Sequence, residues 1–83
     1  MISVEQAVQS AVSFFKVLQK NGGSSDLRVE EVELSQDGKS WLITLGFTTF
    51  GASFADGPRR EYKLFQVNAD NGHVDSMKIR VVQ

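Results

Sequence analysis

The residues that could carry chemistry are few and lie apart in the chain. There is a single histidine, His73, and there is no cysteine. Nucleophilic catalysis needs a serine, threonine or cysteine beside a base, whereas His73 follows a turn glycine, where a solvated side chain is the usual occupant. Gly46 and Gly51 have the spacing of the glycines in a phosphate-binding loop, but Ala52 stands where that loop requires lysine. The sequence therefore predicts a protein that is not an enzyme and has no catalytic residues.

The acidic side chains do not form a metal-binding pattern either. The two glycine-containing turns fail as calcium-binding loops, because Thr44 stands where the bidentate glutamate belongs in one, and Val67 stands at the first ligand position of the other. Asp70, Asn71 and Asp75 could contact a cation weakly, yet turn chemistry explains these residue types equally well. No metal and no cofactor are expected.

Charged residues occur in one acidic and one basic group. The glutamates at 30, 31 and 33 are typical of a solvated sheet edge that discourages strand addition. The basic group lacks interleaved aromatic residues, and it consists of Arg59, Arg60, Lys63, Lys78 and Arg80. The formal net charge is -1, so neither nucleic acid nor an anionic membrane is expected as a partner.

The length and composition predict one small globular domain spanning residues 1–83. The hydrophobic content is 41% and the charged content is 23%, which are ordinary values for a folded chain. The first residues contain no basic run followed by an apolar stretch, so no secretion signal is predicted and a cytoplasmic location is expected. An exported chain whose leader had been removed would look the same. The longest mostly apolar segment, 41–47, is too short to cross a bilayer.

An amphipathic helix is predicted near the N-terminus. Ser3 and Gln6 have the spacing of a capping box, and Asn21-Gly22-Gly23 tolerate the positive φ at which helices end. Between them, apolar residues recur at helical spacing on one face. These residues are Val4, Ala7, Val8, Ala11, Val12, Phe15 and Leu18.

From residue 27 onward, apolar and polar residues alternate, which predicts strands. A loop of two or four residues around Asp37-Gly38 would place Val32 and Leu34 on the same face as Trp41 and Ile43. Residues 27 and 29 are out of phase with Val32, so we expect a β-bulge near residues 30 and 31.

A second hairpin is predicted around the turn Asp70-Asn71-Gly72. With a loop of two or four residues, one face would carry Tyr62, Leu64, Met77, Ile79 and Val81. The other face would carry Phe65, Val67 and Val74. A three-residue loop would instead place Phe65 and Val67 with Met77 and expose Tyr62 and Leu64. We favour the first register, because it pairs Val67 with Val74 and groups apolar residues on both faces.

Together these elements predict an α+β fold, with one N-terminal helix packed on a four-stranded antiparallel meander sheet. The expected core contains Val8, Ala11, Val12, Phe15, Leu18, Trp41, Ile43, Leu45, Tyr62, Leu64, Met77 and Ile79.

Two groups of apolar residues remain outside that core. One lies in the segment 50–58, whose two phenylalanines either cap the core or form a binding tip. The other is expected on the sheet face that the helix leaves open, which then needs a protein partner, a second copy of the chain or the 50–58 segment as its cover. The predicted partner-binding residues are Leu42, Phe50, Phe54, Phe65, Val67 and Val74.

The closing hairpin resembles that of a known family. Its pattern, Tyr62-x-x-Phe65-x-Val67-Asn68-Ala69-x-x-Gly72-x-Val74, is similar to the terminal hairpin of the PepSY domain family, which typically shows an aromatic residue, alternating valines, Asp-Ala-x-Thr-Gly and a closing valine. Asn68 and Asn71 stand where the family usually has Asp and Thr. The resemblance implies a non-catalytic module, found in peptidase propeptides and as free-standing domains, that restrains proteases or binds other proteins.

We therefore expect a protein-binding or regulatory module that acts through the outer sheet face and the 50–58 segment, with a homodimer as one candidate assembly. The alternative is a small ligand-binding domain or enzyme with a pocket between helix and sheet that contains Tyr62 and His73.

Overall fold

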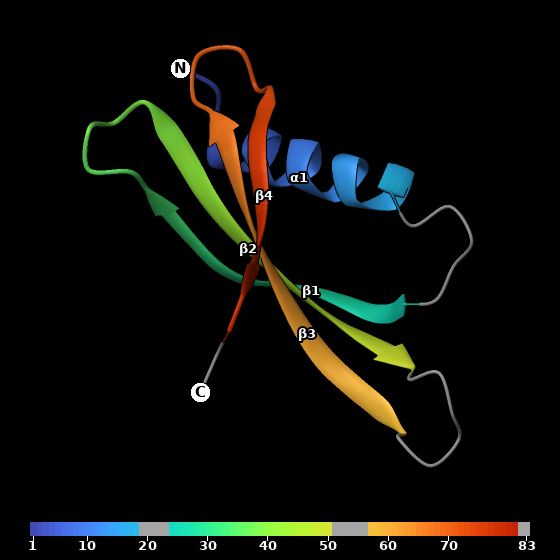
Figure 1. Cartoon of the computed structure of the whole chain (residues 1–83). Coiled ribbons are helices and arrows are strands. Elements are labelled where there is room, and N and C mark those ends of the chain that lie inside the picture. The colour runs from blue at the N-terminus through green and yellow to red at the C-terminus, as the bar shows by residue number, and fades with distance from the viewer. Residues whose placement is uncertain (19–23, 51–56, 82–83) are drawn as a thin grey trace.

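The computed structural model describes residues 1–18, 24–50 and 57–81. These residues form one helix, α1 (Val4–Leu18), and four strands, β1 (Ser24–Leu34), β2 (Ser40–Phe50), β3 (Pro58–Asn68) and β4 (Val74–Arg80). The strands make one antiparallel sheet in the order β1-β2-β3-β4, and α1 lies on one face of it (Figure 1). The predicted α+β fold, with one helix on a four-stranded meander, is confirmed.

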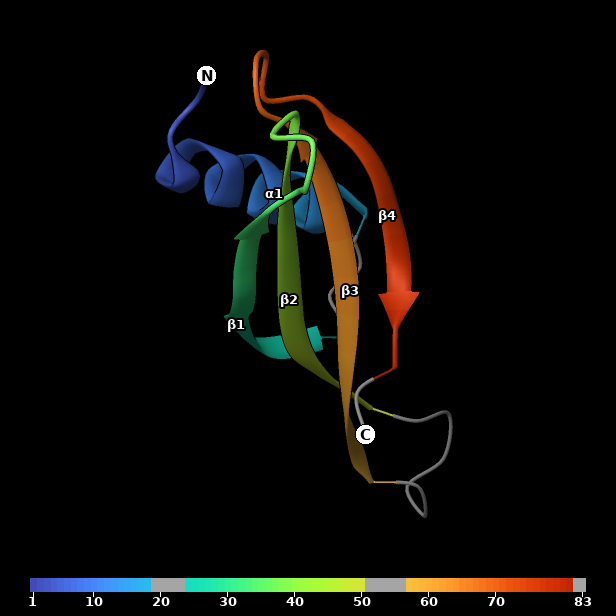
Figure 2. The same cartoon turned by 90° about the vertical axis from the view of Figure 1, so that its left-hand side faces the viewer.

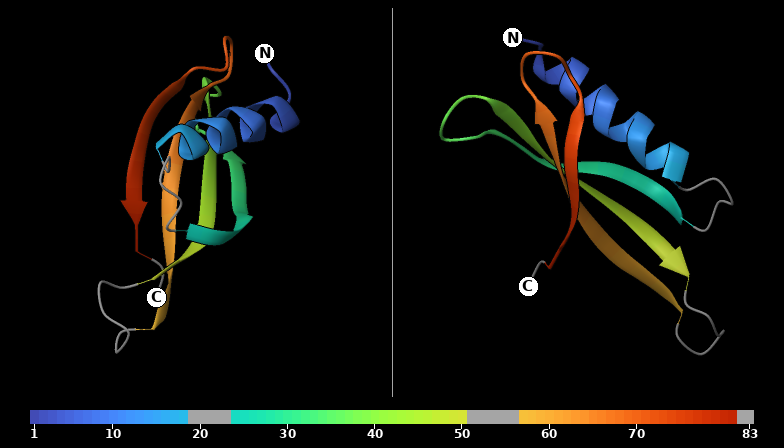
Figure 3. Two further views of the ribbon diagram at one scale, coloured as in Figure 1. Left: turned by 90° about the vertical axis from the view of Figure 1, so that its right-hand side faces the viewer. Right: turned by 45° about the horizontal axis from the view of Figure 1, so that its top comes forward.

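Helix α1 crosses the strands instead of running along them (Figure 3). The end of β2 and the start of β3 therefore extend well beyond it (Figure 1). The buried residues of α1 are Ala7, Ala11 and Phe15. Leu18 was expected in the core but is 52% exposed, because the buried stripe of α1 ends one turn earlier, at Phe15.

Hydrogen bonds attach the start of α1 to the sheet. The predicted capping box is present: the Ser3 N–H donates to Gln6 Oε1 at 2.9 Å, and the Gln6 N–H donates to Ser3 Oγ at 3.2 Å. Just before it, the Ile2 N–H donates to the Ala69 carbonyl at 2.6 Å, and the Ile2 carbonyl accepts from Trp41 Nε1 at 3.3 Å. The first turn of the helix is thus held between β2 and the β3–β4 turn.

The β1–β2 hairpin has the predicted register. Val32 pairs with Ile43, and Leu34 pairs with Trp41. The connecting loop has four residues, 36–39, and is closed by a backbone hydrogen bond between the residues that flank it. The expected sharing of one face by these four side chains is confirmed.

The β-bulge predicted near residues 30 and 31 is also confirmed, since the pairing of β1 with β2 shifts between Val29 and Glu31. Beyond the shift, Val29 pairs with Leu45, a core residue. The extra residue, Glu30, therefore brings Val29 back to the face on which Val32 lies.

The β3–β4 hairpin begins as predicted. The Asn68 N–H donates to the His73 carbonyl at 2.8 Å, and Val67 pairs with Val74, as a four-residue loop requires. The turn is stabilised by the Asn68 side chain, whose Oδ1 accepts the Asp70 N–H at 2.8 Å. Gly72 has a φ of 77°, a conformation that glycine adopts without strain.

The facing predicted for this hairpin is wrong. Between Gln66 and Val67 the register shifts, so Phe65 pairs with Met77. On its other side, Phe65 pairs with Ile43 of β2, which places it under α1. The residues expected on the outer face, Phe65 and Val67, are both 0% exposed in the core.

The core consists of side chains from α1, β2 and β3. Its buried members are Ala7, Ala11, Phe15, Ile43, Leu45, Phe47, Phe65 and Val67. The Phe15 and Phe47 rings lie 4.7 Å apart between centroids. Val8, Val12, Trp41 and Met77 pack against this cluster at its margin. Besides Leu18, three residues predicted for the core lie outside it: Tyr62 and Leu64, half-buried on the other face, and Ile79, which is 79% exposed.

Candidate binding surface

The predicted partner-binding residues do not share one surface. Phe65 and Val67 are core residues, and Val74 packs against the core from the helix side. Among the four of these residues that the structure describes, Leu42 is the one on the face away from α1, where it is half-buried. The prediction that Phe65, Val67 and Val74 join Leu42 on that face is therefore wrong. The other two predicted positions lie outside the described residues, namely Phe54 and the side chain of Phe50.

The sheet face away from α1, which we call the outer face, is mostly polar, and Leu42, Tyr62 and Leu64 are half-buried among its polar side chains. Arg60 on β3 reaches across β2, and its Nη2 lies 2.8 Å from Glu30 Oε1. Its Nη1 donates to the Asp26 carbonyl at 2.7 Å and to Thr48 Oγ1 at 3.3 Å. The hydrogen bond with Glu30 raises the pKa of Arg60 above its ordinary value. Glu30 lies over Gly46, where a Cβ atom would be 2.6 Å from Glu30 Oε1.

A second arginine bridges the same face. Arg80 of β4 pairs with Glu31 of β1, and its Nη1 donates to Thr44 Oγ1 of β2 at 2.7 Å. A hollow of about 220 Å³ beside this bridge is lined by Glu31, Glu33, Leu42, Thr44, Leu64 and Arg80. Both arginines connect β1 to the other strands, so the outer face holds the edge strand in place.

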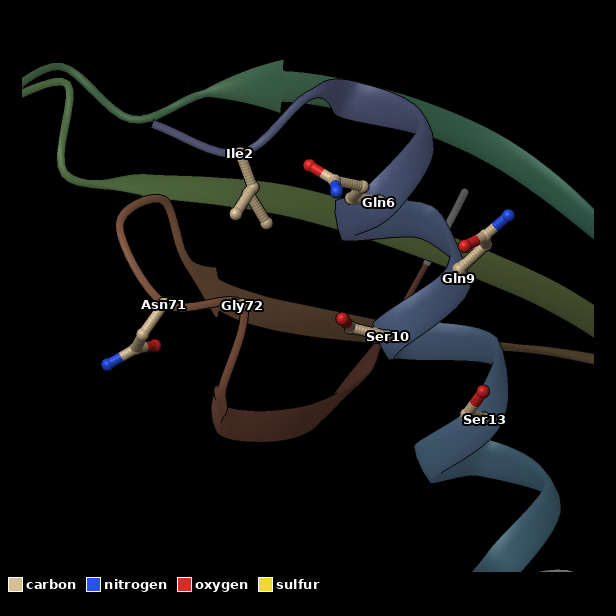
Figure 4. A pocket seen from close by; sticks show the side chains of 7 residues that line it. All are labelled: Ile2, Gln6, Gln9, Ser10, Ser13, Asn71 and Gly72. Atoms are coloured by element: carbon tan, nitrogen blue, oxygen red, sulfur yellow. The ribbon is translucent and has the colours of Figure 1, made fainter.

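A cleft of about 410 Å³ lies between α1 and the β3–β4 turn (Figure 4). Its lining consists of Ile2, Gln6, Gln9, Ser10, Ser13, Asn71 and Gly72. The functional groups in this lining are neutral amides and hydroxyls, which can form hydrogen bonds but are poor bases at neutral pH. The cleft contains no residue with a pKa suited to acid–base catalysis.

The two residues considered for a catalytic or ligand pocket lie apart from each other. Tyr62 pairs with Gly46 on the outer face, so it does not lie between α1 and the sheet. His73 is exposed in the β3–β4 turn, where its N–H donates to Asn71 Oδ1 at 2.8 Å. Within residues 1–18, 24–50 and 57–81, no three His, Cys, Asp or Glu side chains are grouped so that they could hold a metal ion.

An apolar groove of about 450 Å³ separates the N-terminal half of α1 from β1. We call it the α1–β1 groove, and it is lined by Val4, Glu5, Val8, Gln9 and Val32. The helix spacing places Val4 and Val8 on one flank of α1, beside its buried stripe. Val32 faces them from β1 and remains 37% exposed.

Apolar exposure continues along β1 on the same face. Val29 is 45% exposed and Leu34 is 42% exposed. Strand β1 lies at one edge of the sheet and β4 at the other (Figure 2), so no strand of the described residues pairs with the backbone groups of β1 that point away from β2. A hydrophobic strip thus lies directly beside an open strand edge, a combination that natural edge strands usually avoid.

Sequence reasoning did not identify this surface. The relevant signal was present, since Val29, Val32 and Leu34 share a face once the bulge is placed. The alternation could not show that α1 leaves these three residues partly exposed, because that depends on the path of the helix across the sheet.

Comparison of the chain with protein-family models, with curated proteins and with solved structures finds no match. The resemblance to the PepSY family therefore stays a prediction. In the described part of the chain, α1 is the one helix, and it is neither long nor apolar enough to cross a membrane.

Proposed function

We propose that this chain is a non-catalytic protein-binding module whose binding surface is the open edge of β1 together with the α1–β1 groove. The observation that carries the proposal is the strip of Val29, Val32 and Leu34, exposed on the helix side of an edge strand. Folded proteins seldom leave such a strip beside unpaired backbone groups unless another chain covers it.

The geometry favours binding by strand addition. An extended segment placed beside β1 would gain main-chain hydrogen bonds, and every second side chain would point to the helix side. There it would meet Val32, with Val4 and Val8 forming one wall. The bound segment would bury apolar area that is now exposed to water, which drives association.

The glutamates of β1 indicate which charge a bound segment should carry on its outer-face side chains. Glu31 and Glu33 lie on the outer face of β1, opposite Thr44 and Leu42 of β2. A segment that alternates apolar with basic residues would place its basic side chains beside these glutamates. The glutamates discourage addition of acidic or neutral strands and so act as a selectivity element.

A peptide titration tests this function. A synthetic peptide of about eight residues, a usual strand length, would alternate valine and lysine, and a control peptide would alternate valine and glutamate. In NMR spectra of the protein, the valine–lysine peptide should slow amide exchange in β1 and shift the signals of Val4 and Val8. Shifts confined to other elements, or an equal response to both peptides, would contradict the proposal.

Two valine-to-lysine variants provide a matched comparison. Val32→Lys puts a charge into the α1–β1 groove and should abolish the response. Val17→Lys makes the same change at a position on α1 that is 61% exposed and does not line the groove, so binding should remain. Circular dichroism and urea unfolding would show that both variants are folded.

This proposal agrees with the binding or protease-restraining role that the PepSY resemblance implies, but it moves the surface from the outer face to the β1 edge. We propose no catalytic activity, since the cleft beside α1 offers only neutral groups.

A further inference from the structure

Strand β4, at the other edge of the sheet, has the alternation of apolar and basic residues proposed above for a segment that binds β1. Strand β4 alternates apolar and basic residues towards its end, in the order Met77, Lys78, Ile79, Arg80. Met77 and Ile79 pair with Phe65 and Lys63 on the helix side, whereas Lys78 pairs with Leu64 on the outer face. Ile79 is 79% exposed, as is Val81 just beyond the strand.

We propose that the partner of β1 is β4 of a second copy of this chain, which continues the sheet from one molecule into the next. This inference rests on the proposed function and names its occupant. The strands of a meander alternate in direction, and β1 and β4 are the first and fourth. A second copy with its helix on the same face therefore brings β4 antiparallel to β1.

One register of β1 with β4 of the second copy pairs apolar residues on the helix side and opposite charges on the outer face. Placing Val32 opposite Ile79 of the second copy also places Leu34 opposite its Met77, so that all four apolar side chains lie on the helix side. In the same register, Glu33 lies opposite Lys78 and Glu31 lies opposite Arg80 on the outer face. Directly opposite residues in antiparallel strands are close enough for both kinds of contact.

Glu33 and Lys78 are the charged pair that distinguishes a contact between two copies from a contact within one molecule. Arg80 already pairs with Glu31 of its own chain. Among the described residues, the ion pairs involve neither Glu33 nor Lys78. Both side chains are exposed at opposite edges of one molecule, so only a contact between two copies can bring them together.

Charge also argues against the symmetric alternatives. Two β1 strands side by side would bring the glutamates at 31 and 33 of both copies together on one face. Two β4 strands would do the same with Lys78 and Arg80. Like charges opposite each other destabilise a strand pair, so the contact between unlike edges is favoured. Because such a contact is heterologous, it generates rings or open chains of molecules.

Engineered disulfides test which edges meet, and the absence of native cysteine gives a clean background. The variants Val32→Cys and Ile79→Cys would be oxidised separately and as an equimolar mixture. We expect a cross-linked dimer in the mixture and little in either separate sample. Gln36→Cys, in the exposed β1–β2 loop, mixed with Ile79→Cys measures cross-linking by random collision.

The other results would overturn the inference. Equal cross-linking of Val32→Cys alone would show that two β1 strands meet, and equal cross-linking of Ile79→Cys alone would show that two β4 strands meet. A mixture that forms no more dimer than the Gln36→Cys control would show that β1 and β4 do not meet in solution.

Charge exchange provides an independent measurement. Glu33→Lys and Lys78→Glu should each weaken self-association by about five-fold, since each puts like charges opposite each other. The double variant restores an opposite-charge pair across the junction and should recover the wild-type dissociation constant in light-scattering measurements. A double variant as weak as the single ones would contradict the register.

The two proposals can fail separately. If the cysteine mixture does not cross-link but the valine–lysine peptide still protects β1 amides, the second copy is not the partner and the binding function stands. If the peptide also leaves β1 unprotected, both proposals are wrong.

Discussion

Gly46→Ala tests how the outer face holds the edge strand. A Cβ atom at position 46 would lie 2.6 Å from Glu30 Oε1 and 2.8 Å from Glu30 Cγ, which is closer than non-bonded atoms approach. The Glu30 side chain can move away because it is flexible, but it then loses its 2.8 Å hydrogen bond with Arg60 Nη2. Gly46 is not among the residues with positive φ, so alanine fits the backbone there.

Two opposing effects determine the size of the change. The Arg60 and Glu30 side chains are 26% and 35% exposed, and losing a partly exposed pair of this kind costs about 1 kcal/mol. Replacing glycine with alanine restricts the unfolded chain and stabilises the fold by about 0.5 kcal/mol. Gly46→Ala should therefore destabilise the wild type by about 0.5 kcal/mol. In a Glu30→Ala background, where the pair is already absent, it should stabilise by about 0.5 kcal/mol.

A double-mutant cycle in urea measures this change of sign, with an expected coupling of about 1 kcal/mol between positions 30 and 46. Glu31→Ala serves as the matched background, because Glu31 pairs with Arg80 and not with Arg60. Gly46→Ala should remain destabilising there. The reasoning is refuted if Gly46→Ala has the same effect in the wild type and in Glu30→Ala.

Three further predictions follow from the fold. Phe65→Ala should lower the free energy of unfolding by about 3–5 kcal/mol and Leu64→Ala by less than about 1.5 kcal/mol, and equal losses in urea would contradict the assigned facing of β3. Ser3→Ala removes the helix cap and should cost about 1 kcal/mol, whereas an unchanged thermal midpoint would show that the cap contributes nothing. Hydrogen bonds from the Ser35 hydroxyl and the Lys39 N–H lower the pKa of Asp37. In acid, the unfolded chain therefore binds more protons at Asp37 than the folded chain does. The contribution of Asp37 to the free energy of unfolding is present above the unfolded pKa of about 4 and is lost as the pH falls through the folded pKa. Asp37→Asn should accordingly flatten the acid part of a plot of urea midpoint against pH, and a plot that keeps the wild-type slope would contradict this origin.

Local features of the fold could be predicted from the sequence, because neighbouring residues determine them. The capping box needs only Ser3 and Gln6 at the right spacing. The β1–β2 register follows from a short loop and from the alternation on either side of it. The bulge at Glu30 follows from a break in that alternation within the strand itself.

The facing of β3 could not be predicted in the same way. The choice between its two faces depends on how β3 pairs with β2, and the segment between them, 51–57, is too long for turn rules to set the register. The β3–β4 turn by itself predicted the opposite facing, because β4 contains a second bulge. Asp75 is an extra residue between Val74 and Ser76 in the pairing with β3. A shift of one residue exchanges the two faces of a strand, so Phe65 and Val67 moved from the predicted surface into the core.

The binding surface at β1 could likewise be predicted only in part. The apolar face of β1 and the alternation of β4 can both be read from the sequence. That these two strands form the open edges, and that α1 covers β2 and β3 while leaving Val32 exposed, could not be read from it.

The amino-acid sequence by itself determined the α+β fold, the capped helix, both turns and the bulge in β1, because each depends on interactions between residues close in the chain. Only the tertiary structure decided which face of the sheet is the core, that the outer face is held by arginine bridges, and where apolar residues remain exposed. These depend on the register between distant strands and on the path of the helix, which are set by packing side chains that lie far apart in the sequence.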